Sequence, residues 1–191
     1  MEKLADTPLP IHELIRRRWS PRSFASRPVD HATMELLLEA ARWAPSSNNE
    51  QPWRFLYAFR QETDRFERML SCLVEFNAAW ARNAAVLMFP LAQLAFTRGG
   101  KPNRNAFYDV GAAMAFLSLE ATELGVSVHQ MAGFDPEKVH QLFQVPGGIE
   151  AVAGVALGYP GDPETLPPPY KERELAPRER KPQTELIFRE P

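Results

Sequence analysis

The chain has 191 residues, 45% of them hydrophobic and 24% charged, with a formal net charge of −2 at pH 7. This length fits one domain, or one domain with a tail, and the composition allows a hydrophobic core. The lack of a large single-sign charge argues against a nucleic-acid-binding protein. The single cysteine, Cys72, cannot form an internal disulfide, and we find no signal peptide and no run long enough to cross a membrane. The expected location is therefore the reducing cytoplasm.

Hydrophobic periodicity predicts an alternation of helices and strands along the chain. Asp30 and Asp135 are predicted N-caps, and Gly125 is a predicted helix stop. The predicted helices cover residues 11–18, 30–43, 62–80, 106–124 and a segment that opens at 135–137. The predicted strands cover residues 53–59, 84–91, 126–131 and 151–157. This order indicates an α+β fold of at most three layers, in which helices flank a small sheet.

The predicted helix over 106–124 is apolar on nearly all sides, and a small sheet cannot cover all of it. Such a helix needs burial everywhere, so we expect it at the centre of a homodimer interface. After Gly158 the chain becomes charged and proline-rich, with seven prolines between 160 and 182, which disfavour a helix or a central strand there. We therefore divide the chain into a domain over 1–160 and an extension over 161–191. The apolar end of the extension has no partner within it, so the extension is expected to wrap the partner subunit.

A polar, proline-stiffened loop follows the second predicted helix, over residues 44–53. Its side chains able to hydrogen-bond are Ser46, Ser47, Asn48, Asn49 and Gln51. Such a loop suits a binding surface for a flat, polar, phosphorylated ligand. It is equally compatible with a helix-ending loop rich in turn formers.

Basic residues cluster at two places, with four arginines within 16–22 and a second group at 178–181. Arginine forks match phosphate oxygens, and Ser20 adds a hydroxyl donor. The first cluster alone is also compatible with a solvated helix end, but the two together would form a phosphate clamp if they converge. The sequence contains no glycine-rich nucleotide loop, no metal-ligand spacing and no nucleophile elbow. Such a protein either performs no chemistry or takes it from a cofactor.

Three motifs, in order, make the chain resemble the FMN-dependent nitroreductase family over nearly its whole length. They are RWSPRSF at 18–24, PSSNNEQPW at 45–53, and GYP at 158–160 followed by RERKP at 178–182. The resemblance implies a three-layer nitroreductase-like fold, an intertwined homodimer and bound FMN. It implies an enzyme that transfers electrons from NADH or NADPH to a nitroaromatic, quinone or enone by a ping-pong mechanism. The alternatives are a flavin storage or sensing protein with little turnover, and a specialised relative such as a reductive dehalogenase or a flavin-degrading enzyme.

The resemblance also assigns residues to the flavin, and it assigns no catalytic side chain because hydride transfer to N5 needs none. Arg22 would lie near the N1/O2 edge, where a fixed guanidinium stabilises the charge left by reduction. The implied cofactor-binding set is Arg18, Trp19, Ser20, Arg22, Pro45, Ser46, Ser47, Asn49, Asn77, Ala132, Gly133, Arg178 and Arg180. Within this set the arginines at 18, 178 and 180 and Ser20 would hold the phosphate side, and residues 45–49 would come from the other subunit. Asn77 would bind the pyrimidine edge, and the backbone of 132–133 would approach N5 and O4.

Two positions depart from the family pattern. Trp80 stands where some relatives have a lysine, which removes one cation from the flavin edge. Trp19 is bulky where only backbone contact is expected. Both substitutions bear on the redox potential and the substrate fit rather than on FMN binding.

Overall fold

The computed structural model describes residues 3–188, and its centre is a five-stranded antiparallel sheet. The path of the sheet runs β1 (Trp53–Phe59), β2 (Val86–Gln93), β5 (Gly154–Gly158) and β3 (Ser127–Met131), while β4 (Ile149–Ala151) pairs with the far end of β2. Every residue of β2 except Gln93 is buried, as expected of a strand covered on both faces. β2 is therefore the axis of the core.

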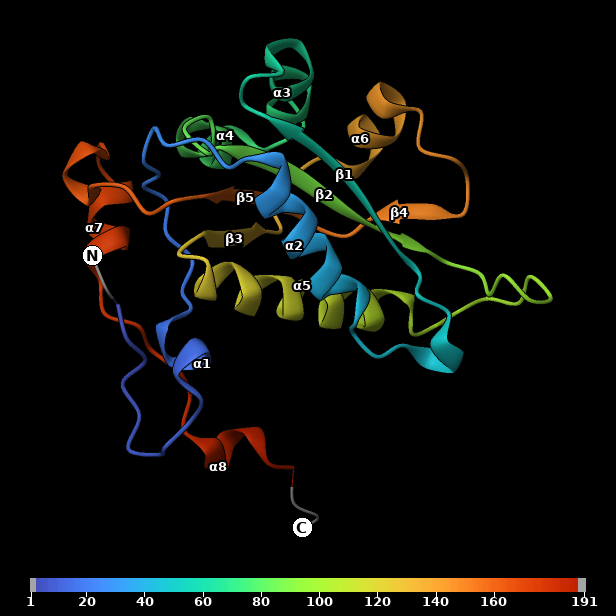
Figure 1. Ribbon diagram of the computed structural model, residues 1–191, viewed down its shortest axis with the longest axis horizontal. Helices are drawn as coiled ribbons and strands as arrows, with labels where there is room; N and C mark the ends of the chain where they lie inside the picture. Colours follow the sequence, from blue (N-terminus) through green and yellow to red (C-terminus); the bar gives the residue numbers. More distant parts are fainter. Residues whose placement is uncertain (1–2, 189–191) are drawn as a thin grey trace.

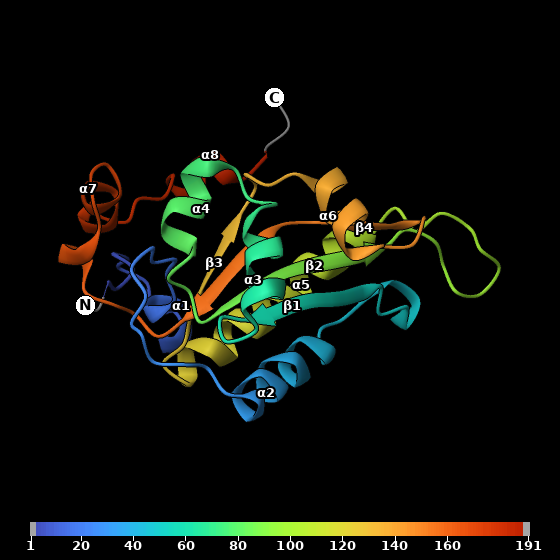
Figure 2. The same cartoon turned by 90° about the horizontal axis from the view of Figure 1, so that it is seen from above.

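Helices cover both faces of this sheet (Figures 1 and 2). One face carries α2 (His31–Arg42) and α5 (Ala106–Glu123), and the other carries α3 (Thr63–Leu70), α4 (Glu75–Ala81) and α6 (Pro136–Phe143). Alternate side chains of β2 enter the two layers, because Val86 and Met88 join the core with α2 and α5 whereas Leu87 and Phe89 join the other. The predicted three-layer α+β fold is confirmed.

Local signals place the helix ends where the sequence predicts them. Asp30 accepts a hydrogen bond from the Thr33 amide at 2.8 Å, and Asp135 accepts one from the Lys138 amide at 3.0 Å. Helix α5 ends beside Gly125, whose φ of +72° is the left-handed conformation that stops a helix.

The predicted single helix over 62–80 is wrong, because the chain leaves helical geometry between α3 and α4. There the carbonyl of Cys72 accepts from the Asp135 amide at 2.8 Å, and the Val74 amide donates to the Gly133 carbonyl at 3.1 Å. These long-range backbone bonds replace helical ones, while the apolar spacing continues across the break. The predicted strand over 151–157 is also divided, into β4 and β5, where the Val152 amide donates to the Pro90 carbonyl at 2.9 Å.

The proline-rich extension contains helices that the sequence did not predict. Helix α7 (Tyr170–Leu175) begins directly after Pro169 and ends before Pro177, so the prolines flank it rather than interrupt it. A short 3₁₀ helix (Pro163–Thr165) precedes it, and α8 (Gln183–Leu186) follows. Helix α8 and the N-terminal α1 (Glu13–Arg17) lie outside the layered body and line a common groove (Figure 1).

Helix α5 is buried along one side only. Its side chains at 106, 110, 113, 114 and 117 are buried against the sheet and α2. Its other side exposes apolar residues, including Phe107, Phe116 and Tyr108, the last with 81% of its surface accessible. Within residues 3–188, no helix has both the length and the apolar character needed to cross a membrane.

Candidate functional site

The two basic clusters converge in the structure, as the phosphate-clamp hypothesis requires. They line one hollow, here called the arginine cleft, between the N-terminal motif and the C-terminal extension. Six of its lining residues are cationic and one is a carboxylate; the full lining is Lys3, Arg18, Trp19, Ser20, Arg22, Arg173, Ala176, Pro177, Arg178, Glu179 and Arg180. Six of the thirteen residues assigned to the flavin therefore meet here.

Three arginines of the cleft, Arg18, Arg178 and Arg180, lack charge compensation among the described residues. Burial lowers the pKa of Arg18, and the neighbouring charges of Arg178 and Arg180 lower it further. Among residues 3–188, no ion pair involves any of these three arginines. The Arg178 Nη1 group is instead bonded to the carbonyls of Lys3 at 2.8 Å and Arg16 at 2.9 Å, which fastens the extension to the N-terminal segment. An uncompensated group of guanidiniums is a site for an anion such as a phosphate.

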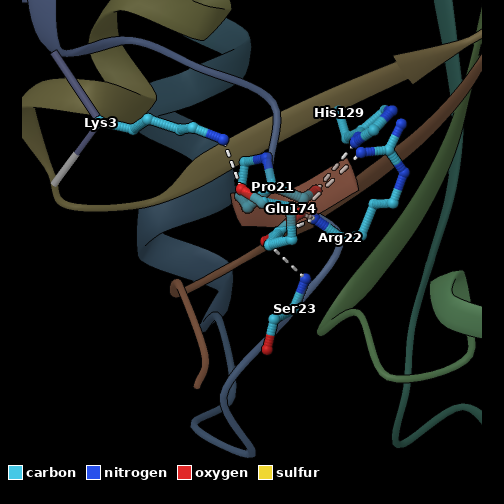
Figure 3. A network of polar contacts seen from close by, with 6 residues as sticks. All are labelled: Lys3, Pro21, Arg22, Ser23, His129 and Glu174. Carbon is cyan, nitrogen blue, oxygen red and sulfur yellow. Dashed lines mark hydrogen bonds and ion pairs between the residues drawn. The ribbon is translucent and has the colours of Figure 1, made fainter. Parts of the chain in front are cut away.

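Arg22 is held from the extension by a residue that the sequence analysis missed (Figure 3). Glu174, on α7, is 1% exposed. Its carboxylate accepts from the Arg22 amide at 2.9 and 3.0 Å and from the Ser23 amide at 3.1 Å. The Arg22 Nε atom is buried without a hydrogen-bond partner. A buried, unpaired donor beside an anion cleft fits a cofactor with oxygen and nitrogen acceptors.

A neutral imidazole lies beside Arg22. The His129 Nδ1 atom is 2.8 Å from the Pro21 carbonyl, and burial lowers the pKa of this histidine to about 4. Trp80 packs on the His129 ring at 4.5 Å between centroids and is only 1% exposed, so the tryptophan that replaces a family lysine belongs to the core. Trp19 lies in the cleft wall, with the Lys3 Nζ atom 5.0 Å from its ring centroid.

A second group of assigned residues adjoins the arginine cleft. The Asn77 Nδ2 atom donates to the Gly133 carbonyl at 3.0 Å, and a Cβ atom at Gly133 would lie 2.6 Å from that nitrogen. Glycine is therefore required for this close approach. Ala132, the preceding residue, is exposed. The guanidinium of Arg173, which lines the cleft, lies 4.8 Å from the ring centroid of Phe76, the neighbour of Asn77.

The polar loop forms a third group, at another place on the molecule. Pro45, Ser46 and Ser47 line a hollow with Asn105, Tyr108 and Asp109, and Asn49 is exposed beside them. Asp109 is 3% exposed, and its carboxylate accepts from the Ser47 amide at 3.0 Å. The sequence analysis missed this acid, although it is the only charged residue within 106–119 and a charge in such an apolar stretch is a usable signal.

The backbone of the polar loop is unusual. Asn48, Asn49 and Gln51 have φ values of 53°, 55° and 53°, in the left-handed region that residues other than glycine rarely adopt. The Ser46 hydroxyl accepts from the Gln51 amide at 3.0 Å, and Glu50 accepts from the Thr97 amide at 2.7 Å. The side chains of Ser46 and Glu50 thus fix the loop, and Glu50 joins it to the segment that begins at Thr97.

A single chain does not bring the polar loop to the arginine cleft. Asp109, in the first turn of α5, holds the loop, whereas Thr122, in the last turn, lines a hollow with Arg17 and Trp19. Thirteen helical residues separate these positions, which corresponds to about 20 Å along the helix axis. The two groups therefore lie at opposite ends of α5 (Figure 1).

Comparisons with known proteins show which family the chain is similar to. Residues 15–159 match the model of the Nitroreductase family. A crystal structure described as an oxidoreductase containing FMN is 35% identical, with a TM-score of 0.90, and the match covers 96% of this chain and 93% of that one.

Named relatives point in the same direction. A Streptomyces coelicolor protein, provisionally named an NADH dehydrogenase/NAD(P)H nitroreductase, is 29% identical over 74% of this chain and 78% of its own length. A Thermus thermophilus protein named NADH dehydrogenase is 28% identical over 76% of this chain and 84% of its own length.

Proposed function

Since this chain belongs to the nitroreductase family, we propose that it is an FMN-dependent enzyme that oxidises NADH or NADPH and reduces an electron-poor acceptor. Nitroaromatics, quinones and enones are the proposed acceptors. The observation that carries the proposal is the arginine cleft, with its six cationic residues against one carboxylate and the unpaired Nε donor of Arg22. The crystal structure described as containing FMN supports the choice of cofactor.

Each part of the cleft has a proposed role. Arg18, Arg178 and Arg180 neutralise the cofactor phosphate, and Ser20 adds a hydroxyl. Arg22 places a positive charge at the edge of the ring system, and Asn77 offers its amide beside it. When bound, the flavin would supply the two-electron chemistry that links the nicotinamide nucleotide to the acceptor in the proposed ping-pong cycle. The residues of this chain bind and orient the reactants and exclude water.

We propose that the complete site forms between two copies of this chain. The exposed apolar side of α5 gives a surface for the second copy, and the separation of about 20 Å between polar loop and cleft supports a loop supplied in trans. Pro45, Ser46, Ser47 and Asn49 would then contact the flavin of the partner. The division into a domain over 1–160 and an extension over 161–191 also remains a proposal, in which the part after Arg180 wraps the partner.

The first test is the purified protein itself. We expect a yellow protein that releases FMN on heating or acidification, identified by absorption and mass spectrometry. Steady-state oxidation of NADH and of NADPH with menadione or a nitrofuran then measures turnover and separates an enzyme from a storage or sensing protein. A colourless protein that takes up no added FMN would overturn the proposal.

A further inference from the structure

A buried carboxylate, that of Glu174, joins the C-terminal extension to the N-terminal motif. This residue comes from the charged helix α7, in which three of the six residues are exposed. Its carboxylate accepts hydrogen bonds from two consecutive backbone amides, those of Arg22 and Ser23. The side chain of Lys3 also donates to its backbone carbonyl. Burial of a carboxylate is costly unless it is hydrogen-bonded in this way.

Hydrogen bonds hold each residue of the segment 21–23, and Figure 3 shows those to His129 and Glu174. The His129 ring is hydrogen-bonded to the Pro21 carbonyl, and the Glu174 carboxylate accepts from the amides of Arg22 and Ser23. The Ser23 hydroxyl donates to the Asp162 carbonyl at 2.7 Å. The Ser23 carbonyl accepts from the Gly161 amide at 2.9 Å. Three of these four partners, Glu174, Asp162 and Gly161, belong to the extension. The extension therefore determines where the main chain of Arg22 lies.

Glu174 also sets the charge around Arg22. Its Oε2 atom is 4.0 Å from Arg22 Nη1, so it offsets part of the positive field of the guanidinium. The Nε atom of the same guanidinium remains buried and unpaired. Arg22 is therefore anchored and partly compensated on one side and has a donor available on the other.

We propose that Glu174 is a positioning residue that fixes Arg22 and lowers its effective charge toward the flavin, so that docking of the extension sets the redox potential of the site. This inference rests on the proposed FMN function. A fixed positive charge favours the more negatively charged, reduced cofactor over the oxidised one. A carboxylate that offsets this charge therefore lowers the midpoint potential, and its removal raises it.

The test compares Glu174→Gln with Glu172→Gln, an exposed glutamate on the same short helix. FMN affinity is measured by fluorescence quenching, the midpoint potential by dye-equilibrated reductive titration, and folding by thermal melting of the apoprotein. We expect Glu174→Gln to raise the ratio of reduced to oxidised FMN affinity by several-fold. A tenfold change in this ratio corresponds to about 30 mV for a two-electron couple. Glu172→Gln should leave the ratio unchanged.

Two further variants separate action through Arg22 from other effects. In an Arg22→Gln background, adding Glu174→Gln should raise the midpoint by clearly less than in the wild type, because only the direct field of the carboxylate is then removed, and a shift of the original size there would overturn the inference. Glu174→Asp keeps the charge but withdraws the carboxylate, so a smaller rise is expected, and this variant decides the matter if Glu174→Gln does not fold. FMN bound with an unmoved midpoint in the folded Glu174 variants would show a purely structural role. Failure of both wild type and Glu172→Gln to bind FMN would instead overturn the proposed function.

Discussion

The arginine cleft and the polar loop differ in what they could offer a ligand. The cleft gathers cations from two segments far apart in the chain, and among the described residues Arg18, Arg178 and Arg180 form no ion pair. The polar loop is a continuous segment with a single charged residue, Glu50, and two of its amides donate to the side chains of Asp109 and Ser46. The cleft therefore offers charge, whereas the loop offers a backbone shape that its own side chains maintain.

This difference shows which changes each region tolerates. Charge in the cleft comes from several arginines, so a single loss weakens an anion site without erasing it. Shape in the loop depends on a few hydrogen bonds that hold three residues at positive φ, a conformation that costs on the order of 1 kcal/mol or more at each. Loss of one such bond should affect the whole loop.

Truncation after Gly161 should have the largest effect. It removes α7, Glu174 and three arginines of the cleft while leaving the polar loop intact. We expect loss of nearly all FMN binding and a weaker dimer, measured by fluorescence quenching and analytical ultracentrifugation. A control truncation after Lys181 keeps these arginines and should retain FMN while weakening the dimer. A dimeric, fully flavin-loaded protein after the longer truncation would contradict the role of the extension.

Single arginine substitutions should have the next largest effect. A charge-assisted contact to phosphate contributes roughly 1.5–3 kcal/mol, so Arg18→Ala and Arg180→Ala should each weaken FMN binding about 10- to 150-fold. The loss should shrink at high salt, because partly exposed charges are screened. The control is Arg65→Ala, which removes an arginine from an exposed pair with Glu62. Unchanged FMN affinity in both cleft variants would show that the clusters are solvated surface.

Asp109→Ala tests the polar loop. The variant leaves the Ser47 amide without its acceptor, at a cost of about 1–3 kcal/mol to the folded state or to the loop conformation. We expect a lower melting temperature of the apoprotein together with weaker FMN binding at unchanged salt dependence. Asp64→Ala, at an exposed acid in the first turn of α3, is the matched control. Normal FMN affinity in folded Asp109→Ala would remove the polar loop from the site.

The smallest expected effect concerns the buried, neutral imidazole of His129 beside Arg22. The pKa of His129 falls from 6.5 to about 4 on folding, chiefly through burial, so the unfolded chain binds a proton that the folded chain does not. Stability should therefore fall as pH drops from about 6.5 to about 4, with about 1 kcal/mol lost from this residue between about pH 7 and about pH 5.5. Urea unfolding of wild type and His129→Phe at both pH values measures it. Equal pH dependence of the two proteins would contradict the assignment.

Local signals were sufficient for the family, the layers and much of the cleft. Helix caps at Asp30 and Asp135 and the stop at Gly125 act within a few residues, so the sequence reveals them directly. The convergence of residues 16–22 with 178–181 was also predicted, because arginines in two motifs of one resemblance suggest a shared phosphate.

Features that depend on distant partners were not predictable in the same way. The break between α3 and α4 arises from backbone bonds to the segment around Gly133, and the apolar spacing gives no sign of it. Glu174 lies in a charged stretch that is typical of a solvated surface. Its burial depends on hydrogen bonds from the amides of Arg22 and Ser23, which lie 152 and 151 residues away in the sequence. The density of prolines in the extension predicts an absence of helices, whereas the prolines around α7 stand at its ends and do not interrupt it.

The contacts of Glu174 also imply an order in which the parts of the arginine cleft come together during synthesis of the chain. A ribosome delivers the N-terminal motif early, and the sheet and its helices can form while the rest of the chain is still being made. The carboxylate that anchors Arg22 emerges 152 residues after it, shortly before Arg178 and Arg180. The arginine cleft therefore cannot close until residues 174–180 have been made, so a chain that stops before Glu174 lacks both the anchor of Arg22 and two arginines of the cleft.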